Sequence, residues 1–147
     1  MTAAVSPALT CPSCGVELTT PLLCERCGAL NEPASTPTPF EALGLEPAYA
    51  LDLIALRRRL LVLSRALHPD HHSNADANTR RLAEDNTAAL NAAFQILSDE
   101  FRRADWLVST LGGPRESDER AMPPVFLQEV LEGNEDIEAA RDAAPMA

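Results

Sequence analysis

Lysine is absent from the sequence, and all 12 basic residues are arginine. Aromatic residues make up only 4% of the 147 residues and β-branched residues are scarce, whereas alanine and leucine are abundant, which favours helices over sheets. No apolar run approaches the roughly 18 residues of a membrane-spanning helix, so no membrane span is predicted. The first ten residues also lack the basic and apolar regions of a signal peptide, which predicts a cytoplasmic location.

The charge is strongly negative, at −10 for the whole chain. Such a chain is a poor nucleic-acid binder, because phosphate contacts need a broad basic surface. The stretch 53–67 is an exception, since it holds four arginines and no acidic residue while its leucines recur every three or four positions. This spacing predicts an amphipathic helix over 50–67 with a basic outer face. That face is either a solvated surface or a recognition surface.

The four cysteines form two Cys-x-x-Cys pairs, Cys11 with Cys14 and Cys24 with Cys27. Two such pairs can complete a tetrahedral four-sulfur site, the preferred site of structural Zn²⁺. Iron in the same site, two disulfides and two redox pairs are the alternatives, and the missing signal peptide disfavours disulfides. We predict a small zinc module over residues 1–30 whose folding depends on the metal.

A mainly α fold is expected after a proline-rich linker over 31–38. The predicted helices cover 40–43, 50–67, 79–97 and a fourth segment that begins at a Ser98-Asp99 cap and ends at Gly112. The fourth helix has apolar residues at spacings of 3, 4 and 3, which predicts that this stripe faces the core: Phe101, Ala104, Val108 and Leu111. The two long helices should form an antiparallel hairpin that the short helices cap.

All three histidines lie in the loop between the two long helices, in the order His68, Pro69, Asp70, His71, His72. One interpretation is a metal site, although no partner ligand is visible elsewhere in the sequence. A second is a hydrolase centre, but no nucleophile or second carboxylate pair accompanies these residues. The third is a recognition loop that presents a proline-stiffened aspartate beside the basic helix.

The order of these features resembles the J domain, which has a short helix, a basic helix, a His-Pro-Asp loop, an antiparallel third helix and a shorter fourth. The chain is most similar to the HscB-type co-chaperones of iron–sulfur cluster assembly, over the stretches 39–45, 90–97 and 102–107. Eukaryotic members of that type also carry two Cys-x-x-Cys pairs ahead of the J domain. The resemblance implies a four-helix J domain over 39–113. It also implies that 114–147 is an incomplete remnant of a scaffold-binding domain.

The resemblance further implies a co-chaperone rather than an enzyme, which stimulates the ATPase of a DnaK-class chaperone and recruits the iron–sulfur scaffold protein. Asp70 would pair with an arginine of the chaperone, while His68 and Pro69 would fix the loop. The arginines expected to meet an acidic patch on the chaperone are Arg57, Arg58, Arg59 and Arg65. The positions expected to contact the scaffold protein are Leu127, Leu131, Glu132 and Glu135.

The C-terminal segment departs from the resemblance, because only about 24 residues follow Pro123 where the family has three helices. Gly133-Asn134 is expected to interrupt its helix, and the residues 142–147 to be disordered. The segment could instead be an amphipathic tail packed on the J domain. Alternatives for the whole chain are a J-domain adaptor for another client, a hydrolase using His68, Asp70, His71 and His72, and a zinc-ribbon nucleic-acid binder. A monomer or weak dimer is expected.

Overall fold

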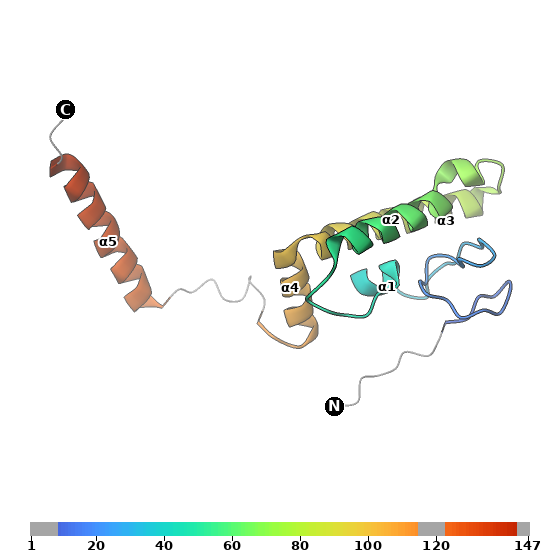
Figure 1. Cartoon of the computed structure of the whole chain (residues 1–147), viewed down its shortest axis with the longest axis horizontal. Coiled ribbons are helices and arrows are strands. Elements are labelled where there is room, and N and C mark those ends of the chain that lie inside the picture. Colours follow the sequence, from blue (N-terminus) through green and yellow to red (C-terminus); the bar gives the residue numbers. More distant parts are fainter. Residues whose placement is uncertain (1–8, 115–122, 144–147) are drawn as a thin grey trace.

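The computed structural model describes residues 9–114 and 123–143 and is mainly helical (Figure 1). In chain order the helices are α1 (Pro39–Leu43), α2 (Leu53–Leu67), α3 (Ala77–Ser98), α4 (Glu100–Thr110) and α5 (Pro124–Ala143). The two described ranges contain isolated β-bridges but no strand, so the mainly α prediction is confirmed. Within the same ranges, no helix combines the length and apolarity needed to cross a membrane.

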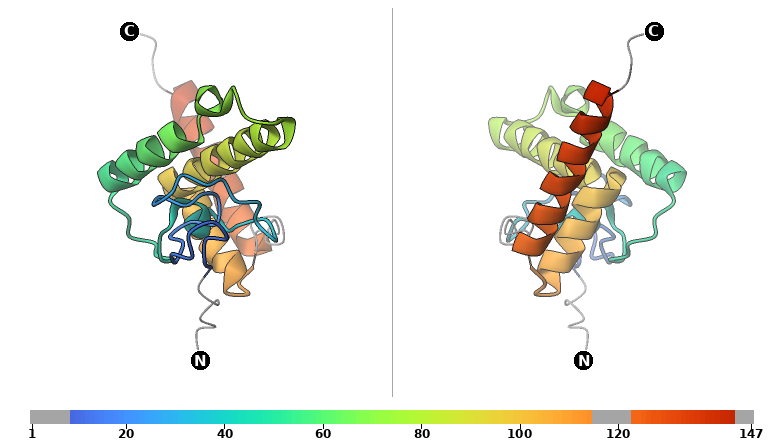
Figure 2. Two further views of the ribbon diagram at one scale, coloured as in Figure 1. Left: turned by 90° about the vertical axis from the view of Figure 1, so that its right-hand side faces the viewer. Right: turned by 90° about the vertical axis from the view of Figure 1, so that its left-hand side faces the viewer.

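The long helices α2 and α3 form the expected antiparallel hairpin, and α1 and α4 pack against α3 (Figures 1 and 2). Leucines of the hairpin meet Phe40 and Leu43 of α1 in a single core. The rings of Phe40 and Trp106 lie 5.4 Å apart, which joins α4 to the same core. Burial of these apolar side chains provides the main driving force for the fold. The hairpin leucines in the core are Leu56, Leu63, Leu67, Leu90 and Leu97.

Aspartate caps set the starts of α2 and α3. α2 begins at Leu53 rather than near residue 50, because the Asp52 carboxylate accepts hydrogen bonds from the Ile54 and Ala55 N–H groups at 2.8 and 3.1 Å. α3 likewise begins two residues earlier than predicted, since the Asp76 carboxylate accepts from the Thr79 N–H at 2.8 Å. These bonds satisfy amide groups that a helix start leaves without partners.

The predicted orientation of α4 is wrong. Phe101 and Leu111 of the proposed core stripe are 78% and 85% exposed. The helix instead buries Arg103, which is 7% exposed and donates a hydrogen bond to the carbonyl of Leu97 at the end of α3. The Arg103 guanidinium also lies 5.2 Å from the centre of the Tyr49 ring. This anchoring turns the side of α4 that carries Trp106 towards the core, so the stripe faces solvent.

The predicted interruption of the C-terminal helix is also wrong. α5 continues through Gly133 and Asn134 to Ala143. One glycine inside a helix costs only about 1 kcal/mol, and good helix formers such as Leu131, Glu132 and Glu135 flank the Gly133-Asn134 pair. Every side chain that is described in α5 is exposed. Part of the tail predicted to be disordered, residues 144–147, lies outside the described residues.

The cysteine-bearing segment packs directly onto the helical hairpin. Leu22 and Leu23 are completely or almost completely buried in the same core as α1, α2 and α3. The buried Thr20 hydroxyl donates to the Ala42 carbonyl at 2.8 Å, and the Asn86 side-chain amide donates to the Leu22 carbonyl at 2.8 Å. The module therefore forms one wall of the core. The predicted domain boundaries of 1–30, 31–38, 39–113 and 114–147 stay a prediction.

Gly44 makes this close packing possible. It ends α1 with φ of 66°, in the left-handed region that favours glycine. A Cβ at this position would lie 2.6 Å from the Thr19 carbonyl oxygen and 2.8 Å from a terminal nitrogen of Arg59. The cysteine-bearing segment and α2 thus both approach the end of α1 too closely for a side chain.

Candidate metal centre and chaperone-binding face

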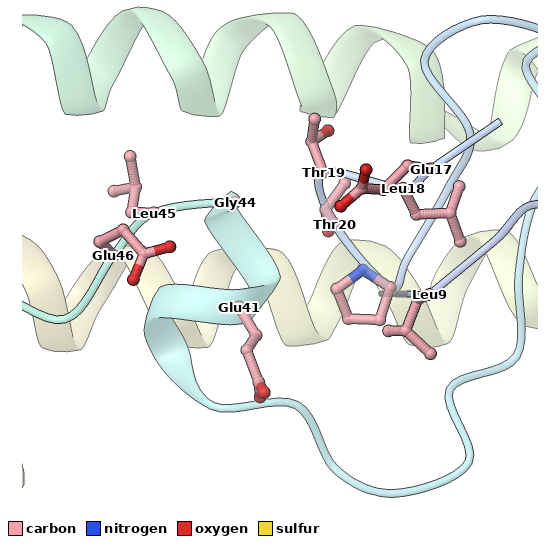
Figure 3. Close-up of a pocket in the computed structure, with 10 residues that line it drawn as sticks. Leu9, Glu17, Leu18, Thr19, Thr20, Glu41, Gly44, Leu45 and Glu46 are labelled. Carbon is pink, nitrogen blue, oxygen red and sulfur yellow. The ribbon is translucent and has the colours of Figure 1, made fainter. Parts of the chain in front are cut away.

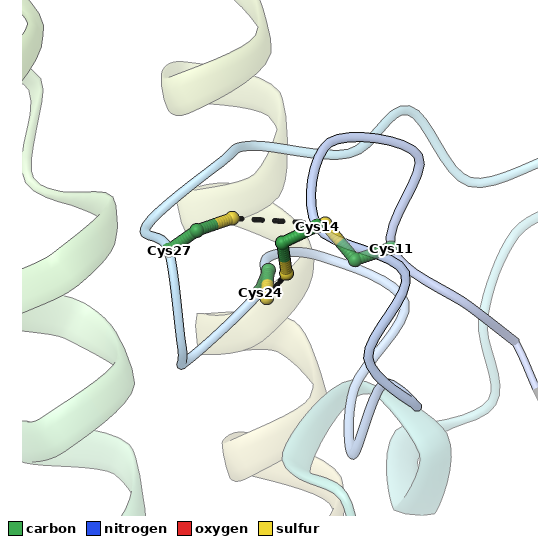
Figure 4. A group of neighbouring side chains, drawn as sticks. All are labelled: Cys11, Cys14, Cys24 and Cys27. Atoms are coloured by element: carbon green, nitrogen blue, oxygen red, sulfur yellow. Dashed lines mark hydrogen bonds between the residues drawn. The ribbon is translucent and has the colours of Figure 1, made fainter.

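The four cysteines converge at one point, as the sequence predicts (Figure 4). Their Sγ atoms all lie within 4.8 Å of one another, with Cys11 and Cys27 3.7 Å apart and Cys14 and Cys24 3.6 Å apart. All four are free thiols, which argues against the disulfide alternative. Tetrahedral zinc with Zn–S bonds of about 2.3 Å requires sulfur–sulfur edges of about 3.8 Å. The quartet therefore fits a four-sulfur metal site.

The two Cys-x-x-Cys turns have the same backbone geometry. In each turn the N–H of the following glycine donates to the carbonyl of the first cysteine at 2.8 Å, from Gly15 to Cys11 and from Gly28 to Cys24. Both glycines have positive φ, 72° and 74°. The chain thus reverses after each pair and brings two sulfurs to one side of the site.

The thiols differ in acidity. Although burial raises the pKa of Cys11, hydrogen bonds from the Cys14 and Ser13 backbone outweigh that effect and lower it to about 6. For Cys27, a backbone hydrogen bond at Ala29 lowers the pKa, but burial and contacts with the other cysteines raise it to about 12. The backbone hydrogen bonds at Cys11 and the burial and cysteine contacts at Cys27 thus account for the difference in pKa. For thiolates gathered at one point, a divalent cation is the natural counter-charge.

Arg59 joins the cysteine module to α2. Its Nε donates to the Leu43 carbonyl at 2.9 Å, and its two terminal nitrogens contact both carboxylate oxygens of Glu25, which follows Cys24. The guanidinium is therefore engaged within the chain, whereas the family resemblance implies that it meets the chaperone. The hydrogen bond from Arg59 holds the pKa of Glu25 below its ordinary value, against the opposing effect of burial. The sequence alone gave no signal for this pair, because 34 residues separate its members.

A Glu25→Gln substitution tests the pair. We expect a loss of roughly 1 kcal/mol in the free energy of unfolding at neutral pH, because a bidentate ion pair becomes a single hydrogen bond from the guanidinium to an uncharged amide oxygen. Since the pKa of Glu25 is lower in the folded state, its stabilising effect is present above the unfolded pKa of about 4.3 and is lost as the pH falls through the folded value. Urea unfolding at several pH values should show the difference from wild type shrinking in acid.

The control for this experiment is Glu46→Gln, which removes an exposed carboxylate that forms no ion pair within the described residues. An equal loss in both variants would mean that overall charge, and not the Arg59 contact, sets the effect.

An acidic hollow of about 510 Å³ lies between the module and α1 (Figure 3). Glu17, Glu41 and Glu46 line it together with apolar side chains. Glu41 has a structural role here, since its carboxylate accepts a hydrogen bond from the Thr38 N–H at 2.8 Å in a capping box at the start of α1. The carboxylates that line the hollow make this side of the cysteine module negatively charged.

The His-Pro-Asp sequence forms a 3-10 turn, Pro69–His72, at the end of the hairpin opposite to α4 (Figure 1). His68 leaves the helical region, with φ of −57° and ψ of 130°, as expected before a proline. Its Nδ1 accepts a hydrogen bond from the Asp70 N–H at 3.2 Å. The Asp70 side chain is 91% exposed. The turn therefore holds a carboxylate out into solvent.

Three of the four predicted arginines, Arg57, Arg58 and Arg65, are exposed on α2. Arg57 and Arg58 border a groove of about 350 Å³ between α2 and α3. The rest of the groove is mostly apolar and consists of Leu53, Ile54, Leu61, Phe94 and Ser98. This face of α2 combines positive charge with exposed apolar surface, and the pattern suits a partner that is both acidic and apolar.

The histidines do not gather into a second metal site. Among the described residues, the cysteine quartet is the one group of three or more potential ligands that converges. His72 Nε2 lies 3.2 Å from the Ala66 carbonyl oxygen, and His68 is engaged with the Asp70 backbone. This arrangement gives no support to the hydrolase alternative. The predicted scaffold contacts Leu127, Leu131, Glu132 and Glu135 are all exposed on α5.

Two solved structures of HscB proteins are similar to this chain. The chaperone HscB of Vibrio cholerae is 32% identical with a TM-score of 0.55, and the match covers 74% of this chain and 63% of that protein. The human co-chaperone HscB is 24% identical with a TM-score of 0.66, and the match covers 94% of this chain and 71% of that protein. The chain thus spans 63% of the length of the bacterial protein. No protein-family model matches the chain.

Proposed function

We propose that this chain, which has the fold of the HscB co-chaperones, stimulates ATP hydrolysis by a DnaK-class chaperone. The observation that carries the proposal is the exposed Asp70 in a proline-stiffened turn that directly follows α2, the helix with three exposed arginines. A J domain uses this arrangement to contact its chaperone.

In the proposed complex, Asp70 forms a charge-assisted hydrogen bond with an arginine of the chaperone, while His68 and Pro69 keep the turn in shape. Arg57, Arg58 and Arg65 meet an acidic patch on the chaperone and orient the two proteins. Such surface charges mainly accelerate encounter, so the association rate should fall as salt rises. Arg59 is left out of this interface, because Glu25 holds it.

The chain contributes no catalytic group in this proposal. The nucleotide site belongs to the chaperone, and the J domain binds best to the chaperone conformation that hydrolyses ATP. Binding therefore raises the population of that conformation, and stimulation is a case of allosteric coupling.

We also propose Zn²⁺ as the metal of the cysteine site. Four sulfurs leave no open position, so the metal would be structural and would not take part in catalysis. For the oligomeric state, a monomer or weak dimer remains the prediction. For the localisation, the cytoplasm remains the prediction.

The proposed client is the iron–sulfur scaffold protein, and the HscB likeness of the chain supports it. Leu127, Leu131, Glu132 and Glu135 of α5 would provide the contacts. An adaptor for a different client is the second candidate, because α5 is the one described helix that follows α4. The same J-domain activity would serve either client.

The test is the ATPase rate of the purified chaperone with this chain as the only J protein, measured with and without the scaffold protein. We expect stimulation by the chain alone and a further increase when the scaffold protein is present. The Leu131→Asp variant should lose the further increase, whereas Val125→Asp on the same helix should keep it. Stimulation that ignores the scaffold protein would favour the adaptor, and an absence of stimulation would contradict the co-chaperone function itself.

A further inference from the structure

α5 has two chemically distinct faces. Phe126, Val130, Gly133 and Ile137 follow spacings of 4, 3 and 4, so at 3.6 residues per turn they share one face. Phe126, Val130 and Ile137 are 42–59% exposed. Three of the four predicted scaffold contacts lie on the other side of the helix, because Leu131 and Glu132 are displaced from the centre of this stripe by about a third of a turn and Glu135 by about half a turn. Leu127 is displaced by about a quarter of a turn and borders the stripe. Scaffold binding through the first three would therefore leave the Phe126–Ile137 stripe without a partner.

The groove between α2 and α3 is complementary to this stripe. Leu53, Ile54 and Leu61 give it an apolar floor, and Arg57 and Arg58 give it positive charge, while no acidic residue lines it. Over residues 124–141, α5 has five acidic residues and one arginine. Glu129 lies at the edge of the stripe. With the stripe on the floor of the groove, Glu129 would therefore lie beside the groove arginines. An amphipathic acidic helix is thus the ligand that both the apolar floor and the charge of this groove favour.

The tether between the two elements is short. Thirteen residues, 111–123, separate α4 from α5, and a stretch of this length spans at most about 45 Å. The groove lies at the α4 end of the hairpin, since Phe94 and Ser98 line it and α4 begins at Glu100. A tether of this kind gives an effective concentration in the millimolar range, so a weak contact suffices for docking.

We propose that α5 docks into the groove between α2 and α3, with its Phe126–Ile137 stripe on the apolar floor and Glu129 beside Arg57 and Arg58. Docked and undocked arrangements exchange, and the structure shows the undocked one. The docked helix covers the arginine face that a chaperone would use and leaves Leu131, Glu132 and Glu135 of the predicted scaffold contacts outward. The docking stands on its own, whereas its competition with the chaperone rests on the proposed function.

The docking is tested on the full chain by NMR, with Glu129→Arg and the control Glu138→Arg, which makes the same charge change on the other side of α5. The amide resonances of Ile54, Arg58 and Leu61 should shift between wild type and Glu129→Arg, and the control should match wild type. High salt should move the wild-type resonances towards those of Glu129→Arg. The shifts should not depend on protein concentration, because the contact is intramolecular.

Three outcomes would overturn the docking. The first is that wild type and Glu129→Arg have identical spectra. The second is that the resonance shifts are confined to the exposed Phe101 and Leu111 side of α4. The third is that the shifts grow with protein concentration, which would indicate binding by a second copy of the chain. In the chaperone assay, Glu129→Arg should lower the concentration needed for half-maximal stimulation by about fivefold without changing the maximum. If the NMR shifts occur but the half-maximal concentration does not fall, α5 docks without competing with the chaperone. If no variant stimulates the chaperone at all, the result contradicts the proposed function and leaves the docking unaffected.

Discussion

The Asp70→Asn variant should fail to stimulate the chaperone ATPase above its basal rate, while its helix content and unfolding midpoint stay at wild-type values. The Asp70 carboxylate is 91% exposed in the free chain, so its loss removes no internal packing. In the complex it would leave an arginine of the chaperone desolvated and without a counter-charge. Breaking such a pair from one side costs about 3–5 kcal/mol, which corresponds to a loss of affinity of more than about 100-fold.

The matched control is Asp105→Asn, which removes another exposed carboxylate at the far end of the molecule, on α4. It should stimulate as wild type does. The two variants carry the same charge, so a difference between them reports position and not net charge. Wild-type stimulation by Asp70→Asn would remove the main support for the co-chaperone proposal.

Removal of the proposed metal should destabilise the helical hairpin as well as the cysteine module. Leu22 and Leu23 lie in the common core, and each contributes about 2 kcal/mol through burial. Loss of the module would also leave the Asn86 amide without the Leu22 and Asn31 carbonyls, to which it now donates at 2.8 and 2.9 Å. Together these losses predict a decrease of several kcal/mol in the free energy of unfolding.

The measurement is thermal unfolding followed by the helical circular dichroism signal, before and after chelation and again after Zn²⁺ is returned. Chelation should lower the midpoint in one cooperative transition, and Zn²⁺ should restore it. Cys14→Ser should reproduce the loss without a chelator. Ser13→Ala, at the exposed neighbouring position, should not. Helices that melt unchanged without metal would show that the module is energetically independent.

Local patterns predicted most of the helices and the metal quartet. The leucine spacing of α2, the stop at Pro69 and the two Cys-x-x-Cys pairs each act within a few residues, so they can be read without the fold. The starts of α2 and α3 were predicted less well, because the Asp52 and Asp76 caps override the apolar periodicity by two or three residues.

Long-range contacts could not be predicted in the same way. The apolar stripe of α4 has good helical spacing, yet the Arg103 contact with the Leu97 carbonyl turns it to solvent. Arg59 has the same sequence signature as its neighbours Arg57 and Arg58, and only the folded position of Glu25 separates their roles. Such assignments depend on which segments meet in space, and one sequence does not contain that information locally.

The packing at Gly44 has a consequence for substitutions at this position. A methyl group at this position would push against the Thr19 carbonyl and the Arg59 guanidinium, so even alanine would force the cysteine module away from its seat. Two separate constraints therefore act on this one residue, the left-handed backbone at the end of α1 and the small space that the seated module leaves there.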